Sequence, residues 1–173
     1  EPYGGIPTLA YSKIFSEGRK KGVIVLLDGQ GMDEAWAGYD YYLSNSNNIV
    51  QGTTYSPLRK NVLNNDFKKL STKFFVKNIF NEDLLNKQYR DIFQTKLQRA
   101  LRFNDRISMM SSTELREPFL DHSLVEYAFC LPRDLKIQNK ISKWGLRKLS
   151  FEMYDKNLLL TPCLLYTSPS PRD

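Results

Sequence analysis

The chain is poor in the residues that build zinc sites, disulfide frameworks and histidine-based catalytic centres. It has two cysteines, Cys130 and Cys163, and one histidine, His122, among 173 residues. Two cysteines without a metal or disulfide pattern lead us to expect a reducing, cytoplasmic setting. A Ser-His-Asp triad would have to use His122, and the chain has no Gly-x-Ser-x-Gly turn. It also lacks a recognisable secretory signal and an apolar run long enough to span a membrane, so no membrane partner is expected.

The charge is only modestly one-sided. The formal net charge is +6, from 25 Lys and Arg against 19 Asp and Glu, and the basic residues are scattered in short groups. An anionic small ligand accounts for this excess as well as a nucleic acid does. We therefore expect small-molecule substrates and no nucleic acid. A basic helical nucleic-acid-binding module remains the alternative of a different class, and it predicts strongly salt-dependent binding.

The most informative segment joins an apolar run to a glycine-rich turn. Residues 23–27 are continuously apolar and predict a buried strand of a parallel sheet. Asp-Gly-Gln-Gly follows at 28–31, with acids at 33 and 34 and a helix expected from there. Ligands bind at the carboxyl ends of such strands, glycines let the backbone approach a phosphate, and the acids suit a first helical turn or a nucleotide-bound Mg²⁺. An ordinary tight turn is the simpler alternative, because the dinucleotide and Walker A patterns are both incomplete.

The remaining pattern is mostly helical, so the expected class is α/β with a single strand predicted at 23–27. The regions expected to be helical are 8–21, 33–42, several within 57–101 with the longest at 84–103 ending near residue 104, 106–115, 123–130 and 143–154. We expect a loop at 44–56 and a short extended or turn piece at 135–137. We also expect a break at 116–121, because Glu117 precedes a proline and is pushed out of the helical region.

Two further groups of charged residues stand among apolar neighbours. Acids and bases alternate at Asp105, Arg106, Glu114 and Arg116, where buried charges would need partners. For each residue taken alone, a structural network that pairs Asp105 with Arg116 or Arg106 with Glu114 is favoured over a catalytic one. Lys143 begins a helix, where the macrodipole disfavours a cation. That placement is typical of an anion clamp, and an exposed surface lysine is the alternative.

Together these segments resemble one enzyme family. Residues 26–34, Leu-Leu-Asp-Gly-Gln-Gly-Met-Asp-Glu, with Ala-Gly-Tyr at 37–39, are similar to the Ser-Gly-x-Gly-x-Asp-Glu…Gly-Gly-Tyr loop of the glutamine-dependent asparagine synthetases. Residues 105–109 and 114–121 resemble its Asp-Arg-x-Ser-Met…Glu-x-Arg-x-Pro-Phe-Leu-Asp signature, and 143–147 its Lys-x-x-Leu-Arg element. All of them occur in the family's order.

The resemblance implies a PP-loop ATP pyrophosphatase-like fold and a partial synthetase domain over residues 1–162. ATP, with Mg²⁺, would activate the side-chain carboxylate of aspartate as an acyl-adenylate, and glutamine-derived ammonia would displace AMP. Lys143 and Gln30 would then be catalytic, and Asp33 would hold the metal. The residues implied to bind or organise the cofactor are Asp28, Gly29, Gly31, Asp33, Glu34, Asp105, Glu114 and Arg116.

The chain departs from the family pattern at two positions of the loop. Asp28 stands at the usual serine, and Gln30 stands where well-studied members have a glutamate proposed to act in the ammonia step. An amide cannot accept a proton there, so another group does so or Gln30 only orients ammonia. The acceptor is therefore open: a related amidotransferase of surface-polysaccharide biosynthesis, or a β-lactam-synthetase-like cyclase, is the alternative.

We also expect a fragment, truncated at both ends. The Ser-Gly-Gly-x-Asp-Ser loop and the nucleophilic cysteine of an N-terminal glutaminase domain would lie upstream, so the chain alone should be inactive. A homodimer stays open. Residues 163–173 resemble a translated sequencing adapter and are treated as a non-native tail.

Overall fold

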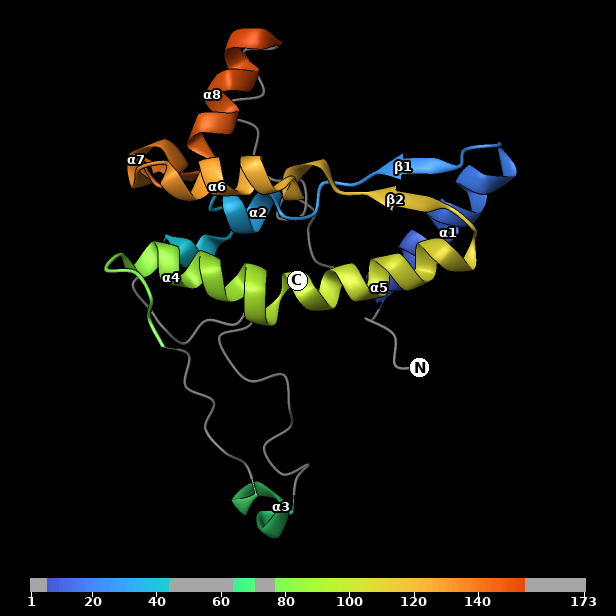
Figure 1. The fold of residues 1–173 in the computed structure, drawn as a ribbon, viewed down its shortest axis with the longest axis horizontal. Coiled ribbons are helices and arrows are strands. Elements are labelled where there is room, and N and C mark those ends of the chain that lie inside the picture. Colours follow the sequence, from blue (N-terminus) through green and yellow to red (C-terminus); the bar gives the residue numbers. More distant parts are fainter. Residues whose placement is uncertain (1–5, 44–63, 71–76, 155–173) are drawn as a thin grey trace, which may run out of the picture.

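The computed structural model describes residues 6–43, 64–70 and 77–154, so the loop expected at 44–56 and the tail at 163–173 lie outside the described residues. Helices dominate, with a few short strands (Figure 1). The elements are α1 Ile6–Lys20, β1 Val25–Leu27, α2 Met32–Ala35, the 3₁₀ turn η1 Asp40–Tyr42, α3 Asn65–Lys69, α4 Asp83–Arg90, the π-helical turn η2 Asp91–Thr95, α5 Leu97–Met110, β2 Glu114–Arg116, the 3₁₀ turn η3 Pro118–Leu120, α6 His122–Cys130, α7 Arg133–Lys136, β3 Ile137–Gln138, β4 Ile141–Ser142 and α8 Trp144–Met153. Within those ranges no helix has both the length and the apolar character to cross a bilayer.

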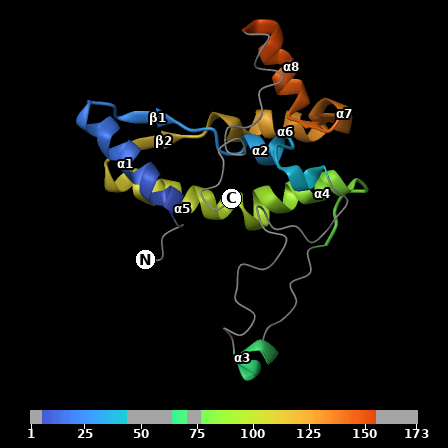
Figure 2. The ribbon, with the colours of Figure 1, turned by 180° about the vertical axis from the view of Figure 1, so that it is seen from behind.

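Strand β1 pairs in parallel with β2, as the apolar run predicted, and the register sets Leu27 opposite Arg116. The expectation that the whole strand is buried is wrong, because Val25 is 38% and Leu27 is 70% exposed. Among the described residues β2 is the only neighbour of β1, and α1 and α5 lie on the same side of the pair (Figures 1 and 2). One side of β1, which carries the apolar Val25 and Leu27, is therefore left uncovered within the described residues.

Helices α4 and α5 form one long rod through the π-helical turn η2 (Figure 1). The predicted end near Asn104 is wrong, since α5 continues to Met110. Asn104 is buried and its amide donates to Asp28, so it does not compete for the backbone of its own helix. The helix expected to continue to residue 115 instead stops at a turn in which Ser112 has a φ of 51°, and β2 begins two residues later.

The helix expected at 33–42 is also interrupted. Helix α2 ends at Ala35 because Ala37 has a φ of 56°, and the chain re-enters a helical turn only at η1. The side-chain amide of the fully buried Gln88, on α4, donates to the carbonyls of Glu34 and Ala35 at 2.7 Å each. These bonds satisfy carbonyls that the short helix leaves without partners.

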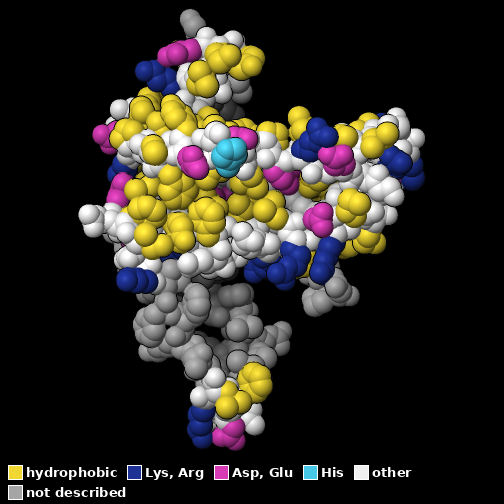
Figure 3. Space-filling model, viewed as in Figure 1, with side chains coloured by type: hydrophobic (Ala, Val, Ile, Leu, Met, Phe, Trp, Pro, Cys, Tyr) yellow, Lys and Arg dark blue, Asp and Glu magenta, His cyan; other side chains and the backbone are white. Residues whose placement is uncertain are grey.

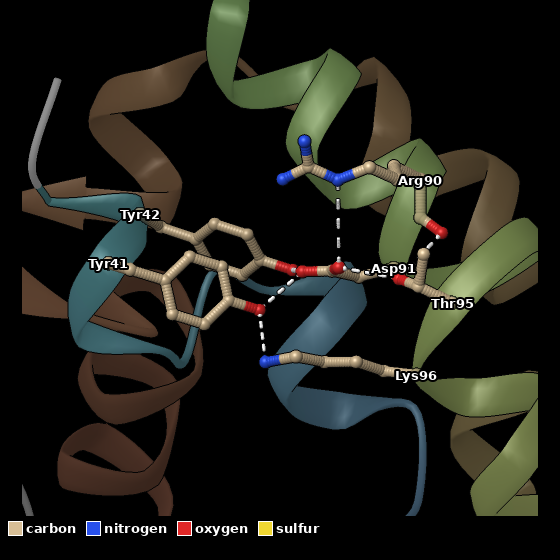
Figure 4. Close-up of polar contacts among 6 residues, drawn as sticks. All are labelled: Tyr41, Tyr42, Arg90, Asp91, Thr95 and Lys96. Atoms are coloured by element: carbon tan, nitrogen blue, oxygen red, sulfur yellow. Dashed lines mark hydrogen bonds and ion pairs between the residues drawn. The ribbon is translucent and has the colours of Figure 1, made fainter. Parts of the chain in front are cut away.

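A buried aspartate ties η1 to η2 (Figure 4). The hydroxyls of Tyr41 and Tyr42 both donate to Asp91, and the Thr95 hydroxyl donates to its other oxygen at 3.0 Å. Lys96 in turn donates to Tyr41 and lies 3.8 Å from the centre of the Tyr39 ring. Because each oxygen of the carboxylate is hydrogen-bonded, its burial is tolerated and the segment after α2 is held firmly.

The hydrophobic core surrounds α2. One cluster contains Ala35, Trp36, Ile92, Leu97 and Ala128, so it joins α2 to the rod and to α6. Figure 3 shows apolar side chains over α4 and α6 and basic side chains over α5. The helices predicted at 8–21, 123–130 and 143–154 are confirmed as α1, α6 and α8, and the piece at 135–137 is the end of α7 and the start of β3.

Candidate functional site

The carboxyl ends of β1 and β2 lie side by side and start two loops. The backbone N–H of Asp28 donates to the carbonyl of Arg116 at 2.9 Å, which continues the parallel pairing one step beyond the strands. The glycine-rich loop and the segment from Glu117 therefore leave the sheet together. This edge is where open α/β sheets bind ligands.

Asp28 fixes the glycine-rich loop. One oxygen of its carboxylate accepts from the Gly29 backbone N–H at 2.7 Å, and the other accepts from the Asn104 amide at 3.1 Å. The aspartate that replaces the family's serine thus bridges β1 to α5. Sequence reasoning selected Asp28 and gave Asn104 no role. The signal for Asn104 was an uncharged polar residue on the buried face of an amphipathic helix.

The two glycines of the loop have different roles. Gly31 has a φ of 90°, and a Cβ there would overlap the side chain of Leu120. Gly29 has no atom within 4 Å of such a Cβ, so its backbone faces open space. Gly31 is therefore required by the fold, whereas Gly29 leaves room for a ligand to approach the backbone.

Lys143 and Asp33 meet in an ion pair with 2.6 Å between Nζ and Oδ1. The pair joins residues 110 positions apart in the chain (143 − 33). The hairpin β3–β4 delivers the lysine, since its two-residue turn at Asn139 and Lys140 has positive φ at both positions, as in a type I′ turn. Lys143 itself has a φ of 54°, a conformation that costs about 1–3 kcal/mol and is concentrated at functional sites.

Gly38 makes this pairing possible. A Cβ at Gly38 would overlap both Asp33 Oδ1 and Lys143 Cε, and the Gly38 N–H donates to the Asp33 carbonyl at 2.7 Å. The second glycine of the family's Gly-Gly-Tyr element is thus explained by the ion pair that it accommodates. The paired charges are still partly exposed, with 21% of the lysine side chain and 41% of the aspartate side chain accessible.

A cavity of about 570 Å³ opens beside the loop. Gln30 and Glu34 line it together with Lys96 and Arg99, two cations at the start of α5. Its other lining residues are Pro7, Thr8, Tyr11, Tyr39, Ala100, Phe103 and Asn104. Glu34 is only 3% exposed and accepts from the Tyr39 hydroxyl at 2.6 Å, and its burial raises the pKa of its carboxyl.

Of the residues expected at the site, Gln30 and Glu34 line that cavity and the others lie outside its lining, as far as the described residues show. Among those outside it, Asp105, Glu114 and Arg116 are exposed. The pairing suggested for Arg116 with Asp105 is wrong, because Arg116 Nε lies 2.7 Å from Glu114 Oε1. Alternate residues of a strand share one face, which brings these two together.

The structure adds a residue that sequence reasoning did not select. Glu117 follows β2 directly, and both of its carboxylate oxygens are buried without a hydrogen-bond partner among the described residues. Burial raises the pKa of its carboxyl to about 7, and the nearby charge of Asp28 adds to the rise while a backbone N–H of Gln30 opposes it. In the sequence it was marked only as an acid at a variable position, the second x of the Glu-x-Arg-x-Pro-Phe-Leu-Asp pattern at 114–121.

The donor set limits how a metal could bind. No group of three His, Cys, Asp or Glu side chains within the described ranges is arranged to hold an ion. Mg²⁺ does not need such a group when a nucleotide supplies phosphate oxygens, because one or two carboxylates then suffice. The partly exposed Asp33 fits that requirement as a single protein ligand.

The sequence is similar to those of two asparagine synthetases. The chain is 30% identical over 148 residues to asparagine synthetase [glutamine-hydrolyzing] 3 of Bacillus subtilis (strain 168), covering 75% of this chain and 24% of that protein. It is 27% identical over 120 residues to asparagine synthetase [glutamine-hydrolyzing] 1 of the same organism, covering 69% of this chain and 19% of the relative. The chain thus spans about a quarter or less of their lengths, and no solved structure matches it. Residues 4–159 match the asparagine synthase family, and the chain belongs to that family.

Proposed function

We propose that this chain contributes the pyrophosphate side of the ATP site in an asparagine synthetase with a PP-loop ATP pyrophosphatase-like fold. The observation that carries the proposal is the ion pair of Lys143 with Asp33, 2.6 Å apart beside the loop that leaves β1. A fixed cation and a metal-binding carboxylate next to open backbone amides are what phosphoryl chemistry needs.

In the first step an oxygen of the aspartate side-chain carboxylate attacks the α-phosphorus of ATP, and the bond to pyrophosphate breaks. Negative charge develops on the departing pyrophosphate, where Lys143 stabilises it. The Gly29 backbone, which is open on its Cβ side, would lie against the phosphates. Asp33 would hold Mg²⁺, which when bound neutralises charge on the phosphates.

In the second step ammonia attacks the acyl carbon and AMP leaves, which gives the amide. The named relatives are glutamine-hydrolysing, and the match covers 24% or less of their lengths, which supports a whole enzyme whose glutaminase domain supplies the ammonia. The family assignment favours this enzyme over a nucleic-acid-binding module. Cytoplasmic location and dimerisation stay predictions.

A different acceptor is the second candidate. Gln30 departs from the family pattern, and the cavity beside it, about 570 Å³, is of a size that accommodates ligands larger than aspartate. A carboxylate carried on a sugar would then be adenylated by the same residues. Lys96 and Arg99 would supply the positive charge that attracts it.

The test is acceptor-dependent ATP–pyrophosphate exchange by the whole enzyme, with aspartate and a sugar carboxylate compared as acceptors. Lys143→Met, which keeps the aliphatic stem, should lower exchange by about 10²–10³-fold. Lys148→Ala, an exposed lysine one turn further along α8, should leave it unchanged. Undiminished exchange in Lys143→Met would refute the proposed site. Absence of exchange together with nucleic-acid binding that weakens steeply as salt is raised would favour the nucleic-acid-binding module.

A further inference from the structure

The departure at position 30 leaves the amide-forming step without an evident base. When ammonia joins the acyl carbon, the nitrogen carries an extra proton that must leave it. A glutamine side chain can donate or accept hydrogen bonds, but it has no basic site for that proton. A carboxylate elsewhere at the same edge of the sheet would solve the problem.

Glu117 occupies such a position. The hydrogen bond from the Asp28 N–H to the Arg116 carbonyl makes residues 28 and 117 the first residues beyond two paired strands. Glu117 is then held by the turn η3, in which the Leu120 N–H donates to its carbonyl at 3.0 Å. The fold thus places its carboxyl next to the loop that carries Gln30.

The carboxylate of Glu117 has fewer partners than it can accept. Both oxygens are buried without a hydrogen bond of normal geometry within the part of the chain that the structure describes, and the backbone N–H of Gln30 lies close enough to lower the pKa of the carboxyl. Leaving a buried acceptor unsatisfied costs about 1–3 kcal/mol, more for a charged group, so such groups in folded proteins call for an explanation. A small nitrogen donor such as ammonia or ammonium would supply the missing hydrogen bond.

The surroundings also suit proton transfer. Besides burial, the charge of Asp28 raises the pKa of Glu117, and the backbone N–H of Gln30 lowers it. Burial raises the pKa of the Tyr11 hydroxyl on α1, and the charge of Glu117 in turn adds to that rise. Burial first, and then the charge of Asp28, raise the pKa of Glu117 to about 7. A base with a pKa near the working pH is both partly ionised and strong enough to take a proton.

We propose that Glu117 is the general base of the amide-forming step and takes over the role that the family's glutamate at position 30 cannot perform in this chain. As the nitrogen–carbon bond forms, a proton passes from nitrogen to the Glu117 carboxylate. The carbon–oxygen bond to AMP breaks, AMP leaves with the electron pair, and Glu117 returns its proton to solvent. This inference rests on the proposed function, and it assigns a role in the second step alone.

The two steps are separable in the whole enzyme. Glu117→Gln keeps the shape of the side chain, so ATP–pyrophosphate exchange should stay within about threefold of wild type while amide formation from ammonium chloride falls by about 10²–10⁴-fold. Glu126→Gln, an exposed carboxylate on α6, is the matched control and should change neither rate. Adding Gln30→Glu to Glu117→Gln should recover part of the amide-forming rate, because it restores a carboxylate at the family's own position.

Three outcomes would overturn the inference. Amide formation within about threefold of wild type in Glu117→Gln means that another group takes the proton. Loss of exchange together with amide formation means that Glu117 maintains the structure. The rate of amide formation is also measured against pH in both enzymes. If Glu117→Gln has the same pH dependence as wild type, the Glu117 carboxyl does not titrate in the reaction. Absence of exchange in the wild-type enzyme itself would instead refute the proposed function.

Discussion

Replacing Gly31 by alanine tests how tightly the loop after β1 is built. The residue has a φ of 90°, a left-handed conformation that costs an L-residue about 1–2 kcal/mol. A Cβ there would also overlap Leu120 Cδ2 and lie 2.8 Å from Leu120 Cγ. Overpacking of this kind costs about 1–3 kcal/mol. We therefore expect Gly31→Ala to lower the free energy of unfolding by about 2–5 kcal/mol.

A double-mutant cycle separates the two contributions. Leu120→Ala removes the three atoms nearest to the new Cβ, but it leaves the backbone conformation of Gly31 unchanged. In that background Gly31→Ala should cost only about 1–2 kcal/mol, which leaves a coupling free energy of about 1–3 kcal/mol.

The measurement is urea unfolding of the four variants, followed by far-UV circular dichroism and fitted with a common slope. An equal cost of Gly31→Ala in both backgrounds would show that Leu120 does not close on the loop. A cost below about 1 kcal/mol in both would contradict the left-handed conformation as well.

Three further outcomes are expected. Gly29→Ala, whose Cβ would meet open space, should change the free energy of unfolding by less than about 0.5 kcal/mol, yet raise the KM for ATP in exchange assays of the whole enzyme. Gly38→Ala should lower the exchange rate at least about tenfold, because its Cβ would separate Lys143 from Asp33. Glu117 binds more protons in the folded than in the unfolded state between pH 4.5 and about 7, so its contribution to stability is lost as pH rises. Glu117→Gln should therefore gain stability relative to wild type across that window, as thermal unfolding at a series of pH values would reveal.

The local elements were predictable where one segment decides them. The apolar run predicted β1 as a strand of a parallel sheet, because a continuously apolar run is typical of such strands, but the partner strand β2 lies where a helix and a break were expected. Helices α1, α6 and α8 follow from periodicity and from stop signals such as Gly22 and Pro132. The interruption at Ala37 was not predictable, since alanine rarely adopts a positive φ; contacts from the distant Gln88 complete the short helix before it.

The site shows the same division. The glycine-rich loop and Lys143 were each recognisable from the residues around them in the sequence. The distance between Lys143 and Asp33, however, depends on the hairpin β3–β4, which lies more than 100 residues after Asp33. Asn104 and Glu117 were given no role for a related reason. Asn104 matters because it faces Asp28, and Glu117 because it faces the loop of Gln30. The pairing of Arg116 with Asp105 was wrong because a helix was assumed up to residue 115. In the structure Glu114 and Arg116 belong to the strand β2, where they share one face and form an ion pair.

The parallel pairing explains how a catalytic carboxylate could change position within this family. Since Leu27 is opposite Arg116, the segments that follow β1 and β2 start at neighbouring points of one edge. An acid two residues beyond Asp28 and an acid immediately after Arg116 can therefore serve the same space from different strands. Moving the carboxylate from position 30 to position 117 needs no change in the fold. It needs only a side chain of suitable length and a buried setting that keeps its pKa near neutrality. Glu117 meets both conditions in this chain, and under the proposal made above Gln30 would orient ammonia by hydrogen bonding rather than accept its proton.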